Sequence, residues 1–214
     1  MLKRLKIMTE SNELAKLPVK DDRELRRVEI IVLTYKNPTI EAMCLEKLIH
    51  NTEHPYKLVV YDNKENPANF SKIWNKLVKE ATCDYVLIMD SDVFVEKGWL
   101  ENMIKNFDDK EVGIVAPNLE YNPDTFDGTI SGCCFLFRRI VFDLVGEFDE
   151  RFYLFGQECE WQKRVLAAGY KIIVEKEAII HHKNKEGSTI QKYYSPDFIE
   201  QDTQYARKLL GIPR

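Results

Sequence analysis

Two aspartates follow a run of apolar residues in the sequence YVLIMDSD, which covers residues 85–92. If the chain stays extended there, Asp90 and Asp92 project to the same side, because side chains alternate along a strand. Paired carboxylates form a hard, oxygen-rich site that suits Mg²⁺ or Mn²⁺, usually shared with the phosphates of a substrate. A metal held there would stabilise the charge of a departing diphosphate. The same pair also fits a simpler arrangement, in which Asp90 ends a strand and Asp92 caps a helix.

Two other groups of residues have types that suit chemistry. Glu158 and Glu160 stand at the start of an expected helix in the sequence ECEWQKRVLAAGY, where the helix dipole favours acids. An acid that faced a crevice from such a position could act as a general base for an incoming hydroxyl. His181 and His182 close the last apolar stretch, and either imidazole could complete a metal site. Only one of them can face the metal, because adjacent strand residues point in opposite directions.

The elements that must position these residues alternate between strands and helices. Short apolar, β-branched runs at 29–34, 57–62, 85–90 and 112–117 predict buried strands. Between them, apolar residues recur at helical spacing at 39–53, 70–78 and 99–107. This pattern predicts an α/β fold with a mostly parallel, Rossmann-like central sheet covered by helices on both faces.

The second half of the chain is less regular. We expect a strand at 129–139, a short helix at 139–148, a helix that ends at Gly169, and one or two strands at 171–182. The charge-rich residues 1–27 predict a helical or partly mobile arm, and residues 28–214 a single domain. Its nucleotide-binding half would span about 28–117 and its acceptor-binding half about 118–214. The polar sequence after His182 predicts a mobile loop.

Polar residues follow the first three predicted strands: Thr34 and Tyr35, then Asp62 and Asn63, then Asp90 and its neighbours. Ligands of open parallel sheets bind beyond the carboxyl ends of the strands. We therefore expect these three strand ends to converge on one crevice.

Composition restricts the class of protein. The 214 residues are 44% hydrophobic and 31% charged, with a net charge of −4. The chain lacks the basic excess of a nucleic-acid binder, so no nucleic-acid partner is expected. The five scattered cysteines include no CxxC pair, which indicates reduced core thiols and a cytoplasmic protein. No stretch is apolar enough for a membrane span, although the N-terminal arm leaves peripheral membrane contact open.

Five motifs together resemble glycosyltransferase family 2, whose members have the GT-A fold. They are VEIIVLTYKNP, VVYDN, YVLIMDSD with its DxD pattern, the long segment from SGCCFLFRR to FGQECEW, and IIHHKNKEGST. They occur in the family's order and span about residues 28–188. The resemblance implies an inverting, metal-dependent enzyme that transfers a sugar from a nucleotide-diphosphate donor to an acceptor hydroxyl. Polysaccharide or glycoconjugate biosynthesis is the implied setting.

The resemblance also implies roles for single residues. The nucleotide sugar would contact Thr34, Tyr35, Asp62, Asn63, Asn75, Asp90 and Ser91. The divalent metal, Mn²⁺ or Mg²⁺, would be held by Asp90, Asp92 and a histidine, for which we select His181. Glu158 falls where the family has its catalytic base, so it would deprotonate the acceptor.

The chain departs from the family pattern at two places. Gln157 precedes Glu158 where the family has an acid, and Trp74 precedes Asn75 where many members have arginine. A positive charge near the diphosphate would then come from Lys76, Lys183 or Lys185. Two alternatives remain at this point. A nucleotidyltransferase would normally carry a glycine-rich loop after its first strand, which LTYKNPTIEA lacks. A non-catalytic nucleotide-sugar or glycan-binding module is the other, and Gln157 favours it.

Overall fold

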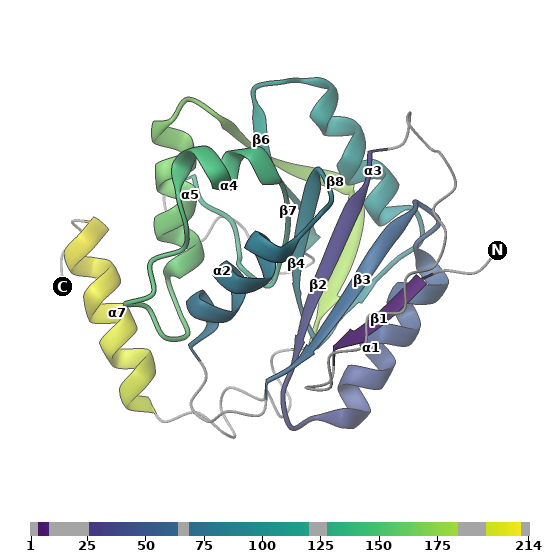
Figure 1. The fold of residues 1–214 in the computed structure, drawn as a ribbon, viewed down its shortest axis with the longest axis horizontal. Coiled ribbons are helices and arrows are strands. Elements are labelled where there is room, and N and C mark those ends of the chain that lie inside the picture. The colour runs from purple at the N-terminus through teal and green to yellow at the C-terminus, as the bar shows by residue number, and fades with distance from the viewer. Residues whose placement is uncertain (1–3, 9–25, 64–68, 120–127, 184–195, 211–214) are drawn as a thin grey trace.

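The architecture is a central sheet with helices on both faces (Figure 1), seen in a computed structural model. The structure describes residues 4–8, 26–63, 69–119, 128–183 and 196–210, the first of these as backbone only. These residues form a sheet of eight strands in the order β1-β3-β2-β4-β7-β6-β8-β5. The strands are β1 (Arg4–Met8), β2 (Val28–Thr34), β3 (Tyr56–Asp62), β4 (Tyr85–Asp90), β5 (Val93–Val95), β6 (Val112–Leu119), β7 (Cys134–Arg138) and β8 (Lys171–His182).

Strand directions make the sheet mixed but mostly parallel. Neighbours among β1, β3, β2 and β4 pair in parallel, and so do β6 and β8. Only β7, which lies between β4 and β6, and β5 at the far edge run against the other described strands. Parallel neighbours need long crossovers, and helices supply them between β2, β3 and β4. The predicted fold class is confirmed.

Helices of the first half cover the two faces in turn. They are α1 (Pro38–Asn51), α2 (Phe70–Glu80) and α3 (Trp99–Lys105), the last continued by a 3₁₀ turn, η1 (Asn106–Asp108). One face of the sheet packs against α1 and α3, through residues such as Leu48 and Trp99. Every residue of β2 is buried, because successive side chains point to opposite, covered faces.

The other face carries α2 together with α4 (Arg139–Val145) and α5 (Gln157–Ala167). Aromatic rings fill this layer. Phe148 lies 5.3 Å from Trp74 and 5.0 Å from Trp161, measured between ring centroids. Phe148 belongs to the irregular segment between α4 and α5, so this core anchors that segment against α2.

Three elements differ from the sequence prediction. Residues 4–8 form strand β1 beside β3, where we expected part of a helical or partly mobile arm; this edge strand satisfies its backbone by pairing with β3. The short strand β5 and the helix α7 (Pro196–Leu210) were not predicted. The predicted strand or strands at 171–182 form one long strand, β8, with an irregular register against β6. Most of the N-terminal arm and of the loop after His182 lies outside the described residues.

All five cysteines are free and buried, as the sequence predicted for reduced core thiols. Within the described ranges, no helix has the length and apolar character needed to cross a membrane.

Candidate active site

The ends of three parallel strands meet at one edge of the sheet, as predicted. In the strand registers, Thr34 pairs with Asp62 of β3, and Leu33 pairs with Asp90 of β4. The backbone N–H of Asn63 donates to the carbonyl of Thr34 at 2.8 Å, which joins the first two ends. Strand β8 runs in the same direction as β4, so its last residue, His182, reaches the same edge.

Asp90, Asp92 and His182 gather at this edge. Nε2 of His182 lies 3.1 Å from Oδ1 of Asp92 and 3.8 Å from Oδ2 of Asp90. One potential ligand atom from each residue lies within 4.8 Å of the others. Antiparallel pairing of β5 with β8 produces this arrangement, because it sets Val93 opposite His182. Two carboxylates and an imidazole form a donor set that suits a divalent cation such as Mn²⁺.

His181 lies on the opposite side of β8, which corrects our choice of histidine. Its Nε2 is 2.7 Å from Oε1 of Glu96, away from the two aspartates. The physical reason is the alternation of the strand, which turns His182 inward when His181 faces Glu96. Of the described residues, His182 is therefore the histidine that could complete a metal site.

The surroundings of Asp90 and His182 shift the pKa values of both side chains. Burial and the nearby charge of Asp92 raise the pKa of Asp90 to about 7. For His182, burial lowers the pKa, but hydrogen bonds to Asp92 and Cys133 and the charge of Asp90 outweigh it, raising the pKa to about 11. A protonated His182 thus supplies positive charge where a divalent cation would fit. A cation would relieve the repulsion between the carboxylates.

Glu158 stands in the first turn of α5, after Gly156, whose φ of +90° suits glycine. Burial raises the pKa of Glu158. The charge of Glu158 also contributes to the raised pKa of Asp90, because the two carboxylates repel each other. A partly desolvated carboxylate with increased proton affinity is suited to accept a proton.

Gly132 makes room for Glu158, and sequence reasoning did not single it out. A Cβ placed on Gly132 would lie only 2.7 Å from Cγ and 2.9 Å from Cδ of Glu158. The next residue, Cys133, accepts a hydrogen bond from the backbone N–H of Asp90 at 2.8 Å. The segment before β7 therefore contacts both acids. The glycine in TISGCC was the available signal, but sequence alone did not show what approaches it.

The residues expected to contact the nucleotide have different surroundings. Thr34, Tyr35 and Asn63 are buried, and Asp62 is exposed. The side-chain N–H₂ of Asn63 has no hydrogen-bond partner among the described residues. A buried amide at the strand-end edge is thus available as a donor to a ligand. Ser91 lies partly exposed in the turn between the two aspartates.

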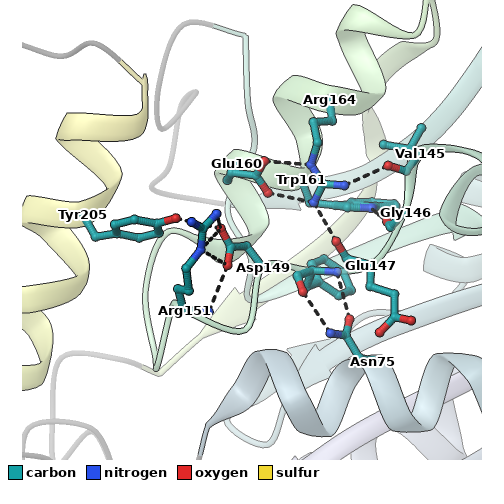
Figure 2. Close-up of polar contacts among 11 residues, drawn as sticks. Asn75, Val145, Gly146, Glu147, Asp149, Arg151, Glu160, Trp161, Arg164 and Tyr205 are labelled. Carbon is teal, nitrogen blue, oxygen red and sulfur yellow. Dashed lines mark hydrogen bonds and ion pairs between the residues drawn. The ribbon is translucent and has the colours of Figure 1, made fainter.

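Asn75 has a structural role, which corrects the expected contact with the nucleotide sugar. Its Nδ2 donates to the carbonyl of Phe148 at 2.9 Å, and its Oδ1 accepts from the Phe148 N–H at 2.8 Å. Figure 2 shows this side chain reaching from α2 to the segment beneath Trp161. Both the N–H₂ and the carbonyl of the Asn75 amide bond the backbone of Phe148. The side chain therefore holds the segment between α4 and α5 and does not reach the strand ends.

The other departures also have structural explanations. Trp74 is buried among aromatic rings. Gln157 is 1% exposed, and its Nε2 donates to the carbonyl of Leu154 at 3.1 Å. Lys76 lies over the ring of Tyr61 and Lys183 over that of Phe94. Lys185 lies outside the described residues.

Comparison with known proteins finds a family that resembles part of this chain. Residues 29–130 match the family described as glycosyl transferase family 2. The match covers slightly less than half of the chain, and over these residues the chain resembles members of that family. The match begins in β2 and includes Asp90 and Asp92, whereas Glu158 and His182 lie beyond it.

Two curated relatives are similar to parts of this chain. The O-antigen biosynthesis protein RfbC of Myxococcus xanthus is 22% identical over 221 residues, which cover 74% of this chain and 17% of that protein. An N-acetylglucosaminyl-diphospho-decaprenol L-rhamnosyltransferase of Mycobacterium tuberculosis is 37% identical over 57 residues, which cover 26% of this chain and 19% of the relative. The alignments therefore span less than a fifth of these curated relatives.

Solved structures share the fold. The mannosyltransferase PcManGT from Pyrobaculum calidifontis, in complex with GDP-Man and Mn²⁺, superposes with a TM-score of 0.67 at 18% identity, covering 90% of this chain and 68% of that one. GalNAc-T7, with UDP, GalNAc and Mn²⁺, gives a TM-score of 0.68 at 11% identity, covering 87% and 48%. At these identities the likeness shows the fold alone, which is the GT-A fold of the glycosyltransferase neighbours.

Proposed function

We propose that this protein is an inverting, metal-dependent glycosyltransferase that moves a sugar from a nucleotide-diphosphate donor to an acceptor hydroxyl. One observation carries the proposal: the Asp90–Asp92–His182 group and Glu158 lie at the carboxyl edge of a GT-A sheet. The family match over residues 29–130 supports the reaction class. The Mn²⁺ complexes of the structural neighbours support the kind of metal.

The metal-binding residues would be Asp90, Asp92 and His182. A divalent ion there would act as a Lewis acid that stabilises the leaving nucleoside diphosphate. Binding requires His182 to release its proton, since only a neutral imidazole coordinates a metal. Thr34, Asp62 and Asn63 would hold the nucleoside from the ends of β2 and β3.

Glu158 would act as the catalytic base. The acceptor oxygen forms its bond to the anomeric carbon as the bond to the diphosphate breaks, and Glu158 takes the hydroxyl proton. A single displacement of this kind inverts the anomeric configuration. Proton transfer to a positioned base contributes roughly 10²- to 10⁴-fold to the rate.

The names of the relatives indicate a setting. The O-antigen biosynthesis protein and the rhamnosyltransferase act in glycoconjugate synthesis by their names, and we propose the same for this chain, with a glycan or other hydroxyl acceptor. The free buried cysteines are compatible with the cytoplasmic location that we propose.

Calorimetric titration tests the donor site. UDP, GDP, CDP and dTDP are each titrated with and without Mn²⁺ into the wild type, Asp92→Ala and Asp84→Ala. We expect one nucleotide to bind only with Mn²⁺, and this binding to be lost in Asp92→Ala. Asp84→Ala is the matched control, because Asp84 is exposed just before the opposite end of β4. Absence of nucleotide binding by the wild type under every condition would contradict the proposed function.

A further inference from the structure

The C-terminal helix α7 is fastened to the segment that leads into α5. Asp202 of α7 is 3% exposed, and its carboxylate accepts three backbone N–H groups of this segment. Oδ1 accepts from Tyr153 at 2.9 Å, and Oδ2 accepts from Leu154 at 2.5 Å and from Phe155 at 2.9 Å. Hydrogen bonds to a charged, buried acceptor are stronger than those between neutral groups. One side chain thus fixes three consecutive residues.

Aromatic contacts extend this fastening along α7. Phe198 stacks on Tyr153 with ring centroids 4.8 Å apart, and the ring of Tyr205 lies 4.7 Å from that of Phe152. The hydroxyl of Tyr205 donates to Oδ2 of Asp149 at 2.9 Å, in the arrangement that Figure 2 shows. The helix therefore holds both ends of the segment from Asp149 to Phe155.

Gly156 connects residues 153–155 to the helix that carries Glu158. It follows Phe155 directly and turns the chain into α5 with a φ of +90°. A Cβ on Gly156 would lie 3.1 Å from Cε1 of Phe152 and 3.2 Å from the Cβ of Ala206, so α7 packs closely on this turn. Glu158 is only two residues farther on, in the first turn of α5. A shift of residues 153–155 would accordingly move its carboxylate.

We propose that Asp202 is a positioning residue, which holds the 153–155 backbone so that Glu158 meets the acceptor hydroxyl. This inference rests on the proposed function, because it assigns Glu158 the role of base. Asp202 itself does not touch the reacting atoms. It acts from a helix that lies outside the matched family segment, at the far end of the described chain.

The surroundings of Glu158 provide a second readout. Burial is the main cause of its raised pKa, and the charge of Asp202 on α7 adds to it. Hydrogen bonds from the backbone N–H groups of Glu158 and Gly156 and from the Cys159 thiol lower this pKa. Among the described residues, Asp90 on β4 also interacts with the charge of Glu158. Loss of the Asp202 charge should lower the pKa of Glu158. The acid limb of the rate profile should then move to lower pH, because the base stays ionised further into acid.

Hydrogen exchange on the wild-type protein tests the fastening without any variant or assay of transfer. The amides of Tyr153, Leu154 and Phe155 should be protected, since each donates to a buried carboxylate. Exchange of these three amides at the rate of an unstructured chain would overturn the proposal, even if the protein transfers sugar.

Kinetics then test the consequence for Glu158. In Asp202→Asn, an amide replaces one carboxylate oxygen and cannot accept all three N–H groups. We expect kcat to fall about 10²-fold, as a misplacement of about 1 Å costs, while the dissociation constant of the nucleotide stays within about twofold. The matched control is Glu200→Gln, which removes one charge from an exposed site on the same helix and should leave both quantities unchanged.

The remaining outcomes are also decisive. A folded Asp202→Asn with wild-type kcat would overturn the positioning role, and so would a variant that loses nucleotide binding and kcat together, because that pattern indicates general destabilisation. If the wild type transfers no sugar from any donor, the proposed function fails, and the positioning role fails with it. The exchange experiment still decides whether Asp202 fastens the segment.

Discussion

The two halves of the candidate site are positioned by different means. The metal corner, defined as Asp90, Asp92 and His182, sits on strands β4 and β8 and on the turn before β5. Backbone pairing of β4 with β2 and β7, and of β8 with β5 and β6, fixes its residues. The base corner, defined as Glu158 with Gly132 and Gly156, has no strand to hold it. It depends on a glycine turn, a close contact and the side chain of Asp202.

Because of this difference, substitutions at the two corners should affect different properties of the protein. A sheet distributes its stability over many backbone hydrogen bonds, so removal of one side chain should leave the metal corner's geometry intact. The base corner relies on a few side chains and on the absence of a Cβ. Substitutions near Glu158 should therefore change the rate of transfer more than nucleotide binding, and those at the metal corner should change binding first.

The largest effect is expected for Glu158→Gln. An amide has the shape of the acid but cannot accept the proton, so transfer should fall by about 10²- to 10⁴-fold. Nucleotide binding should stay at the wild-type level, because the metal corner is unchanged. Initial rates of transfer and titration with the nucleotide measure the two properties separately.

Glu80→Gln supplies the control for this prediction, since Glu80 is exposed at the end of α2. A Glu158→Gln protein with undiminished transfer would remove Glu158 as the base. If the wild type binds a nucleotide sugar but transfers nothing, the non-catalytic binding module becomes the better description.

The next prediction concerns Gly132→Ala. The added methyl group would occupy space within 2.7 Å of Glu158 Cγ, so the Glu158 side chain must shift. A displacement of about 1 Å at the reacting groups costs about 10²-fold in rate. The rate constant for transfer should fall by that factor, with the affinity for the nucleotide retained.

Gly169→Ala is not a suitable control, because Gly169 has a positive φ that alanine would strain. Wild-type transfer by Gly132→Ala would instead show that the base corner adjusts easily, and the contrast between the corners would be lost.

Much of this arrangement could be predicted from sequence, and the exceptions have a common cause. Apolar runs identified the strands whose ends carry Thr34, Asp62 and Asp90. A strand that is buried on both faces is apolar at successive positions, so its own sequence reveals it. The alternation of a strand showed that one histidine must face inward. It could not show which one, since that depends on how β5 pairs with β8.

Long-range packing explains the remaining misses. Asn75 was assigned to the nucleotide by its position in a motif, but the segment around Phe148 uses its amide. Asp202 lies in a helix that no motif predicted, and its three backbone partners precede it by more than forty positions in the chain. Contacts of this kind depend on the completed fold and have no local signal.

His182→Ala and His181→Ala form a matched pair for the metal corner. His182 contacts Asp92, whereas His181 pairs with Glu96 on the other side of β8. Loss of a residue that only hydrogen-bonds a metal ligand lowers metal affinity by roughly 10- to 100-fold. Loss of the ligand itself should lower it by at least as much. Titration of each variant with Mn²⁺ should show this loss for His182→Ala and an unchanged affinity for His181→Ala. Equal effects of the two changes would contradict the placement of His182.

Metal affinity should also rise with pH. The pKa of His182 is raised to about 11, so the metal-free protein holds this proton throughout the neutral range, and the metal must displace it. One displaced proton gives about a tenfold increase in apparent affinity per pH unit. Below the pKa of Asp90, about 7, a second proton adds to the dependence. Mn²⁺ titrations at two pH values about one unit apart measure this dependence. A flat profile would show that His182 releases no proton when the metal binds.

The smallest effect tests the stability of the segment from Asp149 to Phe155, which α7 contacts next to the base corner. Arg151 hydrogen-bonds Asp149 and lowers the pKa of that carboxyl to about 2, and Tyr205 donates to it from α7. A lowered pKa in the folded state stabilises the protein above the unfolded value of 3.8, and this stabilisation is lost as pH falls toward 2. Arg151 is largely exposed, so screening should limit the loss in Asp149→Asn to about 1 kcal/mol at pH 7.

Urea denaturation at neutral pH and near pH 3 measures this difference between wild type and Asp149→Asn, which should narrow in acid. The exposed pair of Arg139 and Asp143 provides the control, since Asp143→Asn should cost less than about 0.5 kcal/mol. Nucleotide affinity should not change in either variant, because the metal corner is held by the sheet. If Asp149→Asn weakened nucleotide binding instead, the two corners would be coupled through the segment that α7 holds, and their independence would be disproved.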